Sequence, residues 1–360
     1  MKIMTIFGTR PEIIRLNLVM KKLDRYCDHV MVHTGQNYTD SLNTIFFNDF
    51  QLRTPDYWLG VHGNTMGEQV GQILQETEKV MLKEKPDKIL ILGDTNSALS
   101  SFIAKRLGIP VYHMEAGNRC YDDRVPEEVN RRVIDHSSDF LLPYTHRSKE
   151  NLLAEGIPGN SIYVTGNPIN EVINTSTDKI EDSRILDKLG IKENKYFLVT
   201  AHRAENVDIP ERLSNILESL KQISEKYSLP VVCSLHPRTK NMIEKHNLNN
   251  YPEKIKFFEP VGFFDFIKLE KNALCVITDS GTVQEECCIF RKPNITIRDV
   301  TERPETIECG SNMLTGVSPE TILRSIDVVL NSNQDWLPPA EYIERDVSSK
   351  VVKILLGHSE

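Results

Sequence analysis

The chain has 360 residues, of which 39% are hydrophobic and 26% are charged, and its formal net charge at pH 7 is −8. A chain of this length exceeds the size of a single hydrophobic core, so we expect two domains of roughly 150–200 residues each. The acidic balance argues against a nucleic-acid-binding protein, because such proteins present a basic face. No apolar run approaches the ~20 residues that a membrane-spanning helix needs, so no membrane association is expected.

The seven cysteines form no CxxC pair and lie in or beside apolar runs, which predicts buried thiols rather than zinc ligands. The free thiols and the lack of a secretory signal pattern after the first residues indicate a reducing, cytoplasmic compartment.

Strand and helix periods alternate through the first half of the chain. Strands are predicted over residues 1–7, 28–33, 87–92, 110–114, 139–142 and 161–164. Helices are predicted over residues 11–26, 40–50, 65–83, 97–107, 127–136 and 146–155. Short apolar runs that alternate with helical segments of about 10–15 residues are typical of parallel βαβ units.

A charged, weakly apolar stretch over residues 174–194 then interrupts the pattern, and we interpret it as a link between domains. Strands follow over residues 195–200, 229–235, 255–258, 274–277 and 294–297, and a final helix over residues 340–356. The predicted fold is α/β, with two doubly wound Rossmann-like domains facing a central cleft. We place the domains at residues 1–170 and 171–344, with residues from about 345 to 360 packing back on the first. Ligands of such sheets bind at the carboxyl ends of the strands.

A polar cluster, Gly8-Thr9-Arg10-Pro11-Glu12, follows the first predicted strand. A glycine turn before a helix amino terminus, with an arginine beside it, suits an anion such as a diphosphate. The alternative is an ordinary strand–helix turn with a surface arginine. Neither the GxGxxG fingerprint nor the GxxxxGK[ST] loop is present, so no NAD site is expected.

Carboxylates follow the next strands. Asp94 and Glu115 stand at two predicted strand ends, and Glu127 and Glu128 stand in the first turn of a helix. Paired carboxylates at one cleft edge suit general acid–base chemistry when burial raises the pKa of one of them. The alternatives are capping or ion pairing for Asp94 and Glu115, and for one of the two helical glutamates a favourable interaction with the helix dipole.

In the second half, polar residues again follow strands and open helices. Ser280-Gly281 opens a helix fit for a phosphate, and a glutamate one turn in, Glu285 or Glu286, suits two ribose hydroxyls. The other cleft candidates in this half are His202, Arg203, His236, Arg238, Arg298 and Arg303. We interpret the scattered His33, His62, His113 and His136 as structural, and no clustered metal-ligand spacing or GxSxG nucleophile motif occurs. A nucleotide diphosphate explains this distribution of residues.

Six ordered blocks carry a family resemblance: residues 8–12, 93–95, 115–119, 126–131, 279–286 and 298–305. Together they closely resemble the non-hydrolysing UDP-N-acetylglucosamine 2-epimerases, over nearly the whole chain. The resemblance implies the two-domain glycosyltransferase-B-type fold. It also implies an elimination–addition mechanism: UDP leaves C1 as the C2 proton is removed, and UDP then adds back to the glycal. It implies no NAD, no metal and a homodimer.

By motif position the resemblance implies catalytic roles for Asp94, Glu115, Glu127 and His202, with base and acid unassigned. The residues that it implies for binding the UDP-sugar are Arg10, Arg15, Arg119, Arg203, His236, Arg238, Phe264, Ser280, Gly281, Glu286 and Arg303. Leaving-group stabilisation must carry much of the barrier, because the C2 proton is not acidic by itself.

Residues 118–126 depart from the common family pattern and resemble a subgroup from capsule and O-antigen operons. That subgroup converts UDP-2-acetamido-2,6-dideoxy-L-talose to UDP-N-acetyl-L-fucosamine. We hypothesise that Tyr121 and Val125 form an apolar wall where that sugar lacks a 6-hydroxyl. Gln36-Asn37 replaces the Gln-His of substrate-activated relatives, so no allosteric UDP-N-acetylglucosamine site is expected.

Three other functions compete with this one. A retaining glycosyltransferase of the same architecture would need a basic or apolar acceptor surface, and the sequence indicates neither. A hydrolysing 2-epimerase would release N-acetylmannosamine and UDP. A catalytically silent UDP-sugar sensor would keep Arg10, Ser280 and Glu286 but would not need the three carboxylates.

Overall fold

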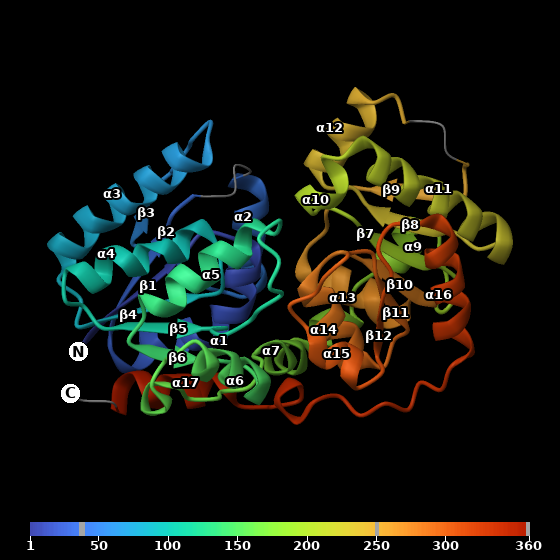
Figure 1. The fold of residues 1–360 in the computed structure, drawn as a ribbon. Coiled ribbons are helices and arrows are strands. Elements are labelled where there is room, and N and C mark those ends of the chain that lie inside the picture. Colours follow the sequence, from blue (N-terminus) through green and yellow to red (C-terminus); the bar gives the residue numbers. More distant parts are fainter. Residues whose placement is uncertain (36–39, 249–251, 358–360) are drawn as a thin grey trace. The chain divides into compact units, whose positions relative to one another are not determined.

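The computed structural model describes residues 1–35, 40–248 and 252–357, so Gln36 and Asn37 lie outside the described residues. The chain divides into two compact units, Met1–Thr175 with Ala340–Glu360, and Ser176–Pro339 (Figure 1). The first unit extends past residue 170 because α7 (Ile169–Thr175) packs against α1 (Arg10–Tyr26). It resumes at residue 340, where the Asn167 amide donates to the Glu341 carbonyl at 2.8 Å.

The first unit is built on a six-stranded parallel sheet with the order β3-β2-β1-β4-β5-β6. Its strands are β1 (Lys2–Phe7), β2 (Asp28–His33), β3 (Tyr57–Trp58), β4 (Lys88–Leu92), β5 (Val111–Met114) and β6 (Phe140–Leu142). Its other helices are α2 (Asp40–Asp49), α3 (Met66–Glu84), η1 (Asn96–Leu99), α4 (Ser100–Arg106), α5 (Pro126–His136), α6 (His146–Ala154), η2 (Gly159–Ser161), η3 (Ala340–Tyr342) and α17 (Val347–Gly357). The strand order is that of the doubly wound dinucleotide-binding fold.

Helices cover both faces of this sheet. Met81 of α3, Ala104 of α4 and Ile134 of α5 share one buried core with strand residues such as Ile6 and Ile91. Helices α1, α7 and α17 pack against one another away from that core (Figure 1). Strands buried on both faces explain why they appear in the sequence as continuous apolar runs.

The second unit repeats the plan, with the strand order β12-β11-β10-β7-β8-β9, again all parallel. Its strands are β7 (Phe197–Thr200), β8 (Val231–Ser234), β9 (Ile255–Phe258), β10 (Cys275–Thr278), β11 (Asn294–Thr296) and β12 (Asn312–Leu314). Its helices are α8 (Thr177–Glu181), α9 (Ile185–Leu189), α10 (Ala204–Val207), α11 (Pro210–Tyr227), α12 (Pro237–Lys245), α13 (Phe263–Asn272), α14 (Gly281–Phe290), α15 (Pro304–Glu308) and α16 (Pro319–Asn331). The predicted α/β class, with two parallel doubly wound sheets, is confirmed.

Strand register decides which side chains meet at the carboxyl edge of each sheet. Leu92 at the end of β4 pairs with Met114 at the end of β5, so residues 93 and 115 leave the first sheet side by side. In the second sheet Thr200 of β7 pairs with Thr278 of β10, and their hydroxyls are 2.6 Å apart. The turns that follow these four strand ends carry Asp94, Glu115, His202 and Ser280.

Local structure differs from the predictions at three places. Residues 161–164 form no strand: Ile162 makes one isolated bridge to Leu141. Residues 174–194 are not an open link, because Ile180, Ile185 and Ile191 are buried in α8, α9 and the segment after them. The short edge strands β3 and β12 were not predicted.

All seven cysteines carry free thiols. Of the helices in the described part of the chain, none is both long and apolar enough to cross a membrane.

Candidate active site

The turn between β1 and α1 is organised around Glu12, which is buried in the first turn of α1. Its Oε2 accepts hydrogen bonds from the Gly8 amide at 3.0 Å, the Thr9 amide at 2.8 Å and the Thr9 hydroxyl at 2.7 Å. Its Oε1 accepts from the Thr95 hydroxyl at 3.1 Å. Burial raises the pKa of Glu12 to about 7, although these hydrogen bonds oppose the shift. Glu12 thus joins the turn after β1 to the turn after β4.

Arg10, at the first position of α1, is half-buried. Burial lowers the pKa of its guanidinium. Among the residues that the structure describes, Arg10 has no hydrogen-bond or ion-pair partner. A partly desolvated guanidinium of this kind is a favourable site for an anion.

Asp94, in the turn after β4, is held by α5. Its Oδ2 accepts from Arg131 Nε at 3.1 Å and also from Arg131 Nη2. Asn130 donates to the Asp94 carbonyl at 3.0 Å. Arg131 is 3% exposed, whereas the Asp94 side chain remains 26% exposed. The carboxylate is therefore fixed in orientation but open to solvent.

Glu115, in the turn after β5, is the second fixed carboxylate. Its Oε2 accepts from Arg15 Nη1, and its Oε1 accepts from Asn118 Nδ2 at 3.1 Å. Arg15 is buried, and its guanidinium lies 5.6 Å from the ring centroid of Tyr144. Arg15 was predicted to bind the UDP-sugar, and the structure places it as the partner of Glu115.

The two glutamates that open α5 have different environments. Glu128 is fully buried and accepts from the amides of Cys120 at 3.0 Å and Tyr121 at 3.1 Å, and from Arg131 Nη1 at 2.6 Å. Glu127 is half-buried at the start of the helix. Glu128 anchors the loop that precedes α5, which leaves Glu127 as the candidate for chemistry.

Arg119 was predicted to contact the substrate, but the structure buries it among carboxylates. Its Nε donates to Glu155 Oε1 at 2.7 Å, and its Nη2 lies 2.8 Å from Asp135 Oδ2 and 2.6 Å from Glu155 Oε2. These ion pairs raise the pKa of Arg119. Its donors are committed to the interior of the first unit.

The hypothesis of an apolar wall formed by Tyr121 and Val125 is wrong. Val125 is 2% exposed and belongs to the interior, whereas Tyr121 stands at the surface, so the two side chains form no shared apolar wall. Tyr121 is largely exposed, and its hydroxyl donates to Asn151 Oδ1 at 3.1 Å.

In the second unit, buried Asp279 organises the turn after β7. Its Oδ2 accepts from the amides of His202 and Arg203, both at 2.9 Å, and from Asn206 Nδ2 at 3.2 Å. His202 Nδ1 lies 3.3 Å from Asp279 Oδ1, and the His202 side chain is 40% exposed. The His202 ring centroid is 6.0 Å from that of His236. Asp279 therefore orients His202, and it was absent from the predicted site residues.

The side chains of Glu302 and Arg303 lie close to the amino terminus of α14. Ser280 is its N-cap, and a Cβ on Gly281 would lie 2.8 Å from Glu302 Oε1 and 3.6 Å from Arg303 Cζ. A side chain at position 281 would therefore require the Glu302 carboxylate to shift. Arg303 Nε also donates to buried Glu285, so its positive charge is balanced inside the unit.

Glu286 is buried one turn into α14. Burial, together with the charge of Glu286, raises the pKa of Glu270 well above its usual range. Arg298 is also buried; it donates to Glu302 Oε2 at 2.8 Å and lies 3.3 Å from Glu205. Arg203 Nη2 lies 3.5 Å from Glu302 Oε1. The ion pairs of Glu302 with Arg203 and Arg298, and of Arg298 with Glu205, form a network behind the helix start.

The remaining predicted residues of the second unit are more exposed. His236 is the N-cap of α12, and its Nδ1 accepts from the Arg238 amide at 3.3 Å. Arg238 forms an exposed ion pair with Asp208, with Nε to Oδ1 at 2.8 Å. The ring of Phe264, at the start of α13, lies 5.1 Å from Lys179 Nζ. Arg238 thus contacts Asp208 at the surface.

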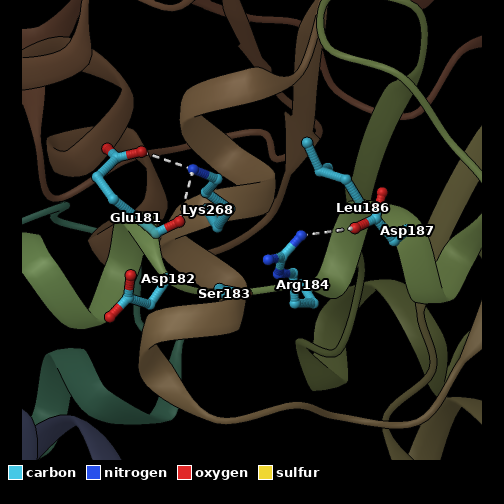
Figure 2. Close-up of a pocket in the computed structure, with 7 residues that line it drawn as sticks. All are labelled: Glu181, Asp182, Ser183, Arg184, Leu186, Asp187 and Lys268. Carbon is cyan, nitrogen blue, oxygen red and sulfur yellow. Dashed lines mark hydrogen bonds and ion pairs between the residues drawn. The ribbon is translucent and has the colours of Figure 1, made fainter.

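A separate surface pocket of about 280 Å³ lies between α8, α9 and α13 (Figure 2). Glu181 accepts hydrogen bonds from Lys268 and Lys271, both at 2.6 Å, and these contacts lower its pKa to about 2. Arg184 faces Asp187 at 3.7 Å. No predicted site residue lines this pocket.

Across residues 1–35, 40–248 and 252–357, no three His, Cys, Asp or Glu side chains are grouped so as to hold a metal ion. Four buried residues that support the site turns were not predicted as site residues: Glu12, Arg131, Asp279 and Glu302. Each of them lies in one of the six sequence blocks that carry the family resemblance. The sequence does not show which side chain each of them contacts.

The family profile described as UDP-N-acetylglucosamine 2-epimerase matches residues 21–356 of this chain. The chain belongs to the UDP-N-acetylglucosamine 2-epimerase family. It is therefore an enzyme of the isomerase class. The UDP-N-acetylglucosamine 2-epimerase of Methanocaldococcus jannaschii is 44% identical over 347 residues, which cover 94% of this chain and 95% of that protein.

Two further relatives extend the comparison. The UDP-2,3-diacetamido-2,3-dideoxy-D-glucuronate 2-epimerase of Pseudomonas aeruginosa is 38% identical over 335 residues, covering 90% of this chain and 91% of that protein. The crystal structure of the Methanocaldococcus jannaschii UDP-GlcNAc 2-epimerase, in complex with UDP-GlcNAc and UDP, superposes with a TM-score of 0.94 at 42% identity. It covers 99% of this chain and 100% of that chain.

Proposed function

We propose that this protein interconverts UDP-N-acetylglucosamine and its C2 epimer, UDP-N-acetylmannosamine, without releasing the nucleotide. One observation carries the proposal. Asp94 and Glu115 follow adjacent strand ends of one sheet, and each carboxylate is fixed by a buried arginine. Inversion at C2 needs a proton removed from one face and another delivered to the opposite face, which two fixed carboxylates can do. Family membership supports the choice of substrate class.

In the proposed reaction one carboxylate takes the C2 proton while the C1–oxygen bond breaks. The C2–H electron pair forms the C1–C2 double bond of a glycal, and UDP departs with the electrons of the C1–oxygen bond. UDP then adds back to C1, and C2 receives a proton on its other face. The C2 proton is weakly acidic, so stabilisation of the departing diphosphate must lower the barrier.

Two features suit the diphosphate. Arg10 is half-buried and has no partner within the described residues, so its charge is available to an anion. The α14 amino terminus offers backbone N–H groups beside Ser280 and Gly281. We assign Glu286, which is buried one turn into α14, to the ribose hydroxyls. We assign His202, which Asp279 orients, to the catalytic residues. The proposal needs no NAD and no metal, and it takes the enzyme to be a cytoplasmic homodimer.

A second candidate substrate is UDP-2,3-diacetamido-2,3-dideoxy-D-glucuronate, which the relative at 38% identity is named for. A third is UDP-2-acetamido-2,6-dideoxy-L-talose, favoured by the sequence of residues 118–126 alone. This third activity would place the enzyme in capsule or O-antigen synthesis.

The test incubates the protein in heavy water with each of the three UDP-sugars separately and follows C2 by proton NMR. The expected result is deuterium at C2 and formation of UDP-N-acetylmannosamine from UDP-N-acetylglucosamine, with total UDP-sugar conserved. Exchange with only the diacetamido or the talose compound would reassign the substrate.

The rival functions give other products in the same tubes. Free N-acetylmannosamine with stoichiometric UDP would identify a hydrolysing epimerase. Absence of C2 exchange with all three sugars, in a protein that binds UDP, would indicate a glycosyltransferase or a sensor and reject the proposal.

A further inference from the structure

The turns that carry Asp94 and Glu115 have backbone conformations that need support. Glu115 itself has a positive φ of 65°, a strained conformation that residues other than glycine rarely adopt. Gly117 has φ of 80°, and a Cβ there would lie 2.2 Å from the Ser148 carbonyl oxygen. Such conformations persist when surrounding contacts impose them.

One side chain, His113 of β5, contacts both turns directly or through a single partner. It is fully buried. Its Nε2 lies 2.8 Å from the carbonyl oxygen of Gly93, the residue before Asp94. Its Nδ1 lies 2.8 Å from Asp135 Oδ1 on α5. The other oxygen of Asp135 accepts from the Gly117 amide at 3.1 Å.

The partners of His113 fix its protonation. A carbonyl oxygen can only accept, so Nε2 must carry a proton. Asp135 accepts from Gly117 and also pairs with Arg119, so it is an ionised carboxylate that likewise can only accept. Burial opposes ionisation of Asp135, but the hydrogen bond and charge of His113 and the charge of Arg119 lower its pKa overall. Both ring nitrogens therefore donate.

We propose that His113 is a positioning residue, held as a buried imidazolium that ties the Gly93–Asp94 turn to the Glu115–Gly117 turn through Asp135. It touches no reacting atom in this scheme. It fixes the carbonyl that precedes one carboxylate and the amide that follows the other, so the separation of the two carboxylates depends on it. The proposal deepens the proposed function, since it takes Asp94 and Glu115 as the proton-transfer groups.

The formal charges of His113 and the ionised groups linked to it sum to zero. Arg119 and His113 supply two positive charges, and Asp135 and Glu155 supply two negative ones, linked by contacts of 2.6–2.8 Å. His136, on the same helix as Asp135, faces Glu155 from the outer side at 3.6 Å. A neutral cluster of this kind allows an imidazolium to stay buried, because each charge has a partner.

A second buried histidine of the first unit, His29, provides a control for His113. His29 of β2 is also buried and also pairs through Nδ1 with a carboxylate, Asp24, at 2.7 Å. Its Nε2, however, lies 2.9 Å from the Thr5 hydroxyl, which can donate or accept. The hydrogen bonds of His29 therefore do not require protons on both ring nitrogens, and its partners Asp24 and Thr5 lie outside the turns that carry Asp94 and Glu115.

The first experiment labels the ten histidines of the wild-type protein with ¹⁵N and examines their rings by NMR at pH 7.5. The expected result is that His113, assigned by its absence from the spectrum of H113Q or H113N, carries protons on both nitrogens. A bare nitrogen on His113 would overturn the proposal, whatever the catalytic activity of the protein.

The second experiment compares H113Q with H29Q in the C2-exchange assay. A glutamine amide cannot donate to both Gly93 and Asp135 along the same directions, and misplacement by about 1 Å can cost ~100-fold in rate. We expect kcat of H113Q to fall about 10- to 100-fold with KM nearly unchanged, and H29Q to keep its kcat despite a similar loss of stability. A folded H113Q with wild-type kcat would overturn the proposal.

Different measurements would contradict the proposed function and the proposed role of His113. A wild-type protein that exchanges no C2 proton rejects the proposed function, while the ring protonation of His113 still decides whether the imidazolium exists. If H113Q does not fold, the wild-type NMR result decides by itself.

Discussion

The two units share one architecture but hold their site residues with opposite charge arrangements. In the first unit the candidate residues are carboxylates, Asp94 and Glu115, and the buried partners are arginines, Arg131 and Arg15. In the second unit the candidate groups are His202 and the α14 amino terminus, and the buried partners are carboxylates.

This difference shows how one fold prepares two kinds of chemistry. An arginine behind a carboxylate favours the ionised form and fixes its direction, which suits proton transfer. A carboxylate that accepts backbone amides, as Asp279 does, shapes a turn whose remaining donors suit an anion. The comparison predicts that loss of a carboxylate such as Asp94 in the first unit lowers proton exchange, and that loss of the buried carboxylate Asp279 in the second unit weakens UDP binding.

The largest expected effect is on the first unit. Asp94→Asn removes the charge but keeps the shape, and Arg131 retains its contact with Glu128. We expect kcat for C2 exchange to fall about 10²- to 10⁴-fold. UDP affinity, measured by calorimetry, should change little.

Asp24→Asn is the control for this substitution. The Asp24 side chain is also 26% exposed and also pairs with an arginine, Arg53, at 2.9 Å. Its kcat should equal that of the wild type. A D94N enzyme with normal exchange would remove Asp94 from the proposed mechanism.

The second-largest effect is expected from loss of Asp279, the buried carboxylate that fixes the turn after β7. Asp279→Asn replaces hydrogen bonds to a charged acceptor by weaker ones, so we expect the free energy of unfolding to fall by about 1.5–3 kcal/mol. We also expect UDP to bind about tenfold more weakly, a change of about 1.4 kcal/mol. Urea unfolding and calorimetry measure the two quantities.

Asp327→Asn, which changes an exposed carboxylate bonded to Lys226 and Tyr227, should leave UDP affinity intact. A D279N protein that binds UDP as tightly as the wild type would break the comparison between the units.

The third prediction concerns Glu12, a buried carboxylate of the first unit whose hydrogen-bond donors, from Gly8, Thr9 and Thr95, are neutral. Its pKa in the folded protein is about 7, above the value of 4.5 for the free side chain. Its contribution to stability is therefore fully present below pH 4.5 and is lost as the pH rises through about 7.

The isosteric variant Glu12→Gln provides the reference, because its amide oxygen can keep three donors while its NH2 faces the Thr95 hydroxyl. Relative to E12Q, the wild type should lose roughly 3 kcal/mol of unfolding free energy between pH 4.5 and pH 8, because one pKa unit corresponds to about 1.4 kcal/mol. A difference that stays flat, or rises with pH, contradicts a raised pKa.

The smallest effect is expected at the surface pocket of the second unit. Glu181→Gln weakens exposed ion pairs with Lys268 and Lys271, and such pairs contribute about 0–1 kcal/mol. Chemical unfolding should detect little change, and UDP affinity and C2 exchange should match the wild type. A large loss of either activity would show that this pocket belongs to the functional site.

The sequence predicted most of the framework because long apolar runs mark central strands. Residues 28–33 were predicted with the bounds of β2, and the predicted strand over residues 87–92 exceeds β4 by one residue. The positions of Asp94 and Glu115 at one sheet edge followed from parallel topology. The edge strands β3 and β12 have two and three residues, too few for a periodic signal.

What could not be predicted depends on contacts across long sequence distances. Arg119 looked like a substrate ligand because it follows a motif glycine, and its partner Glu155 stands 36 residues further on. Residues 174–194 looked like a link because their charges outnumber the apolar residues. Ile180, Ile185 and Ile191 are nevertheless buried, which follows from packing on α13 rather than from composition.

The return of the chain to the first unit at residue 340 has a consequence for synthesis on the ribosome. Buried Lys88 of β4 donates to the Leu355 carbonyl at 2.7 Å, and Glu171 accepts from the Ser348 amide at 2.8 Å. Neither partner exists until the whole of residues 176–339 has been translated. The second unit, which is contiguous, can therefore complete its core first, while the first unit waits with its α17-binding surface on α1 uncovered.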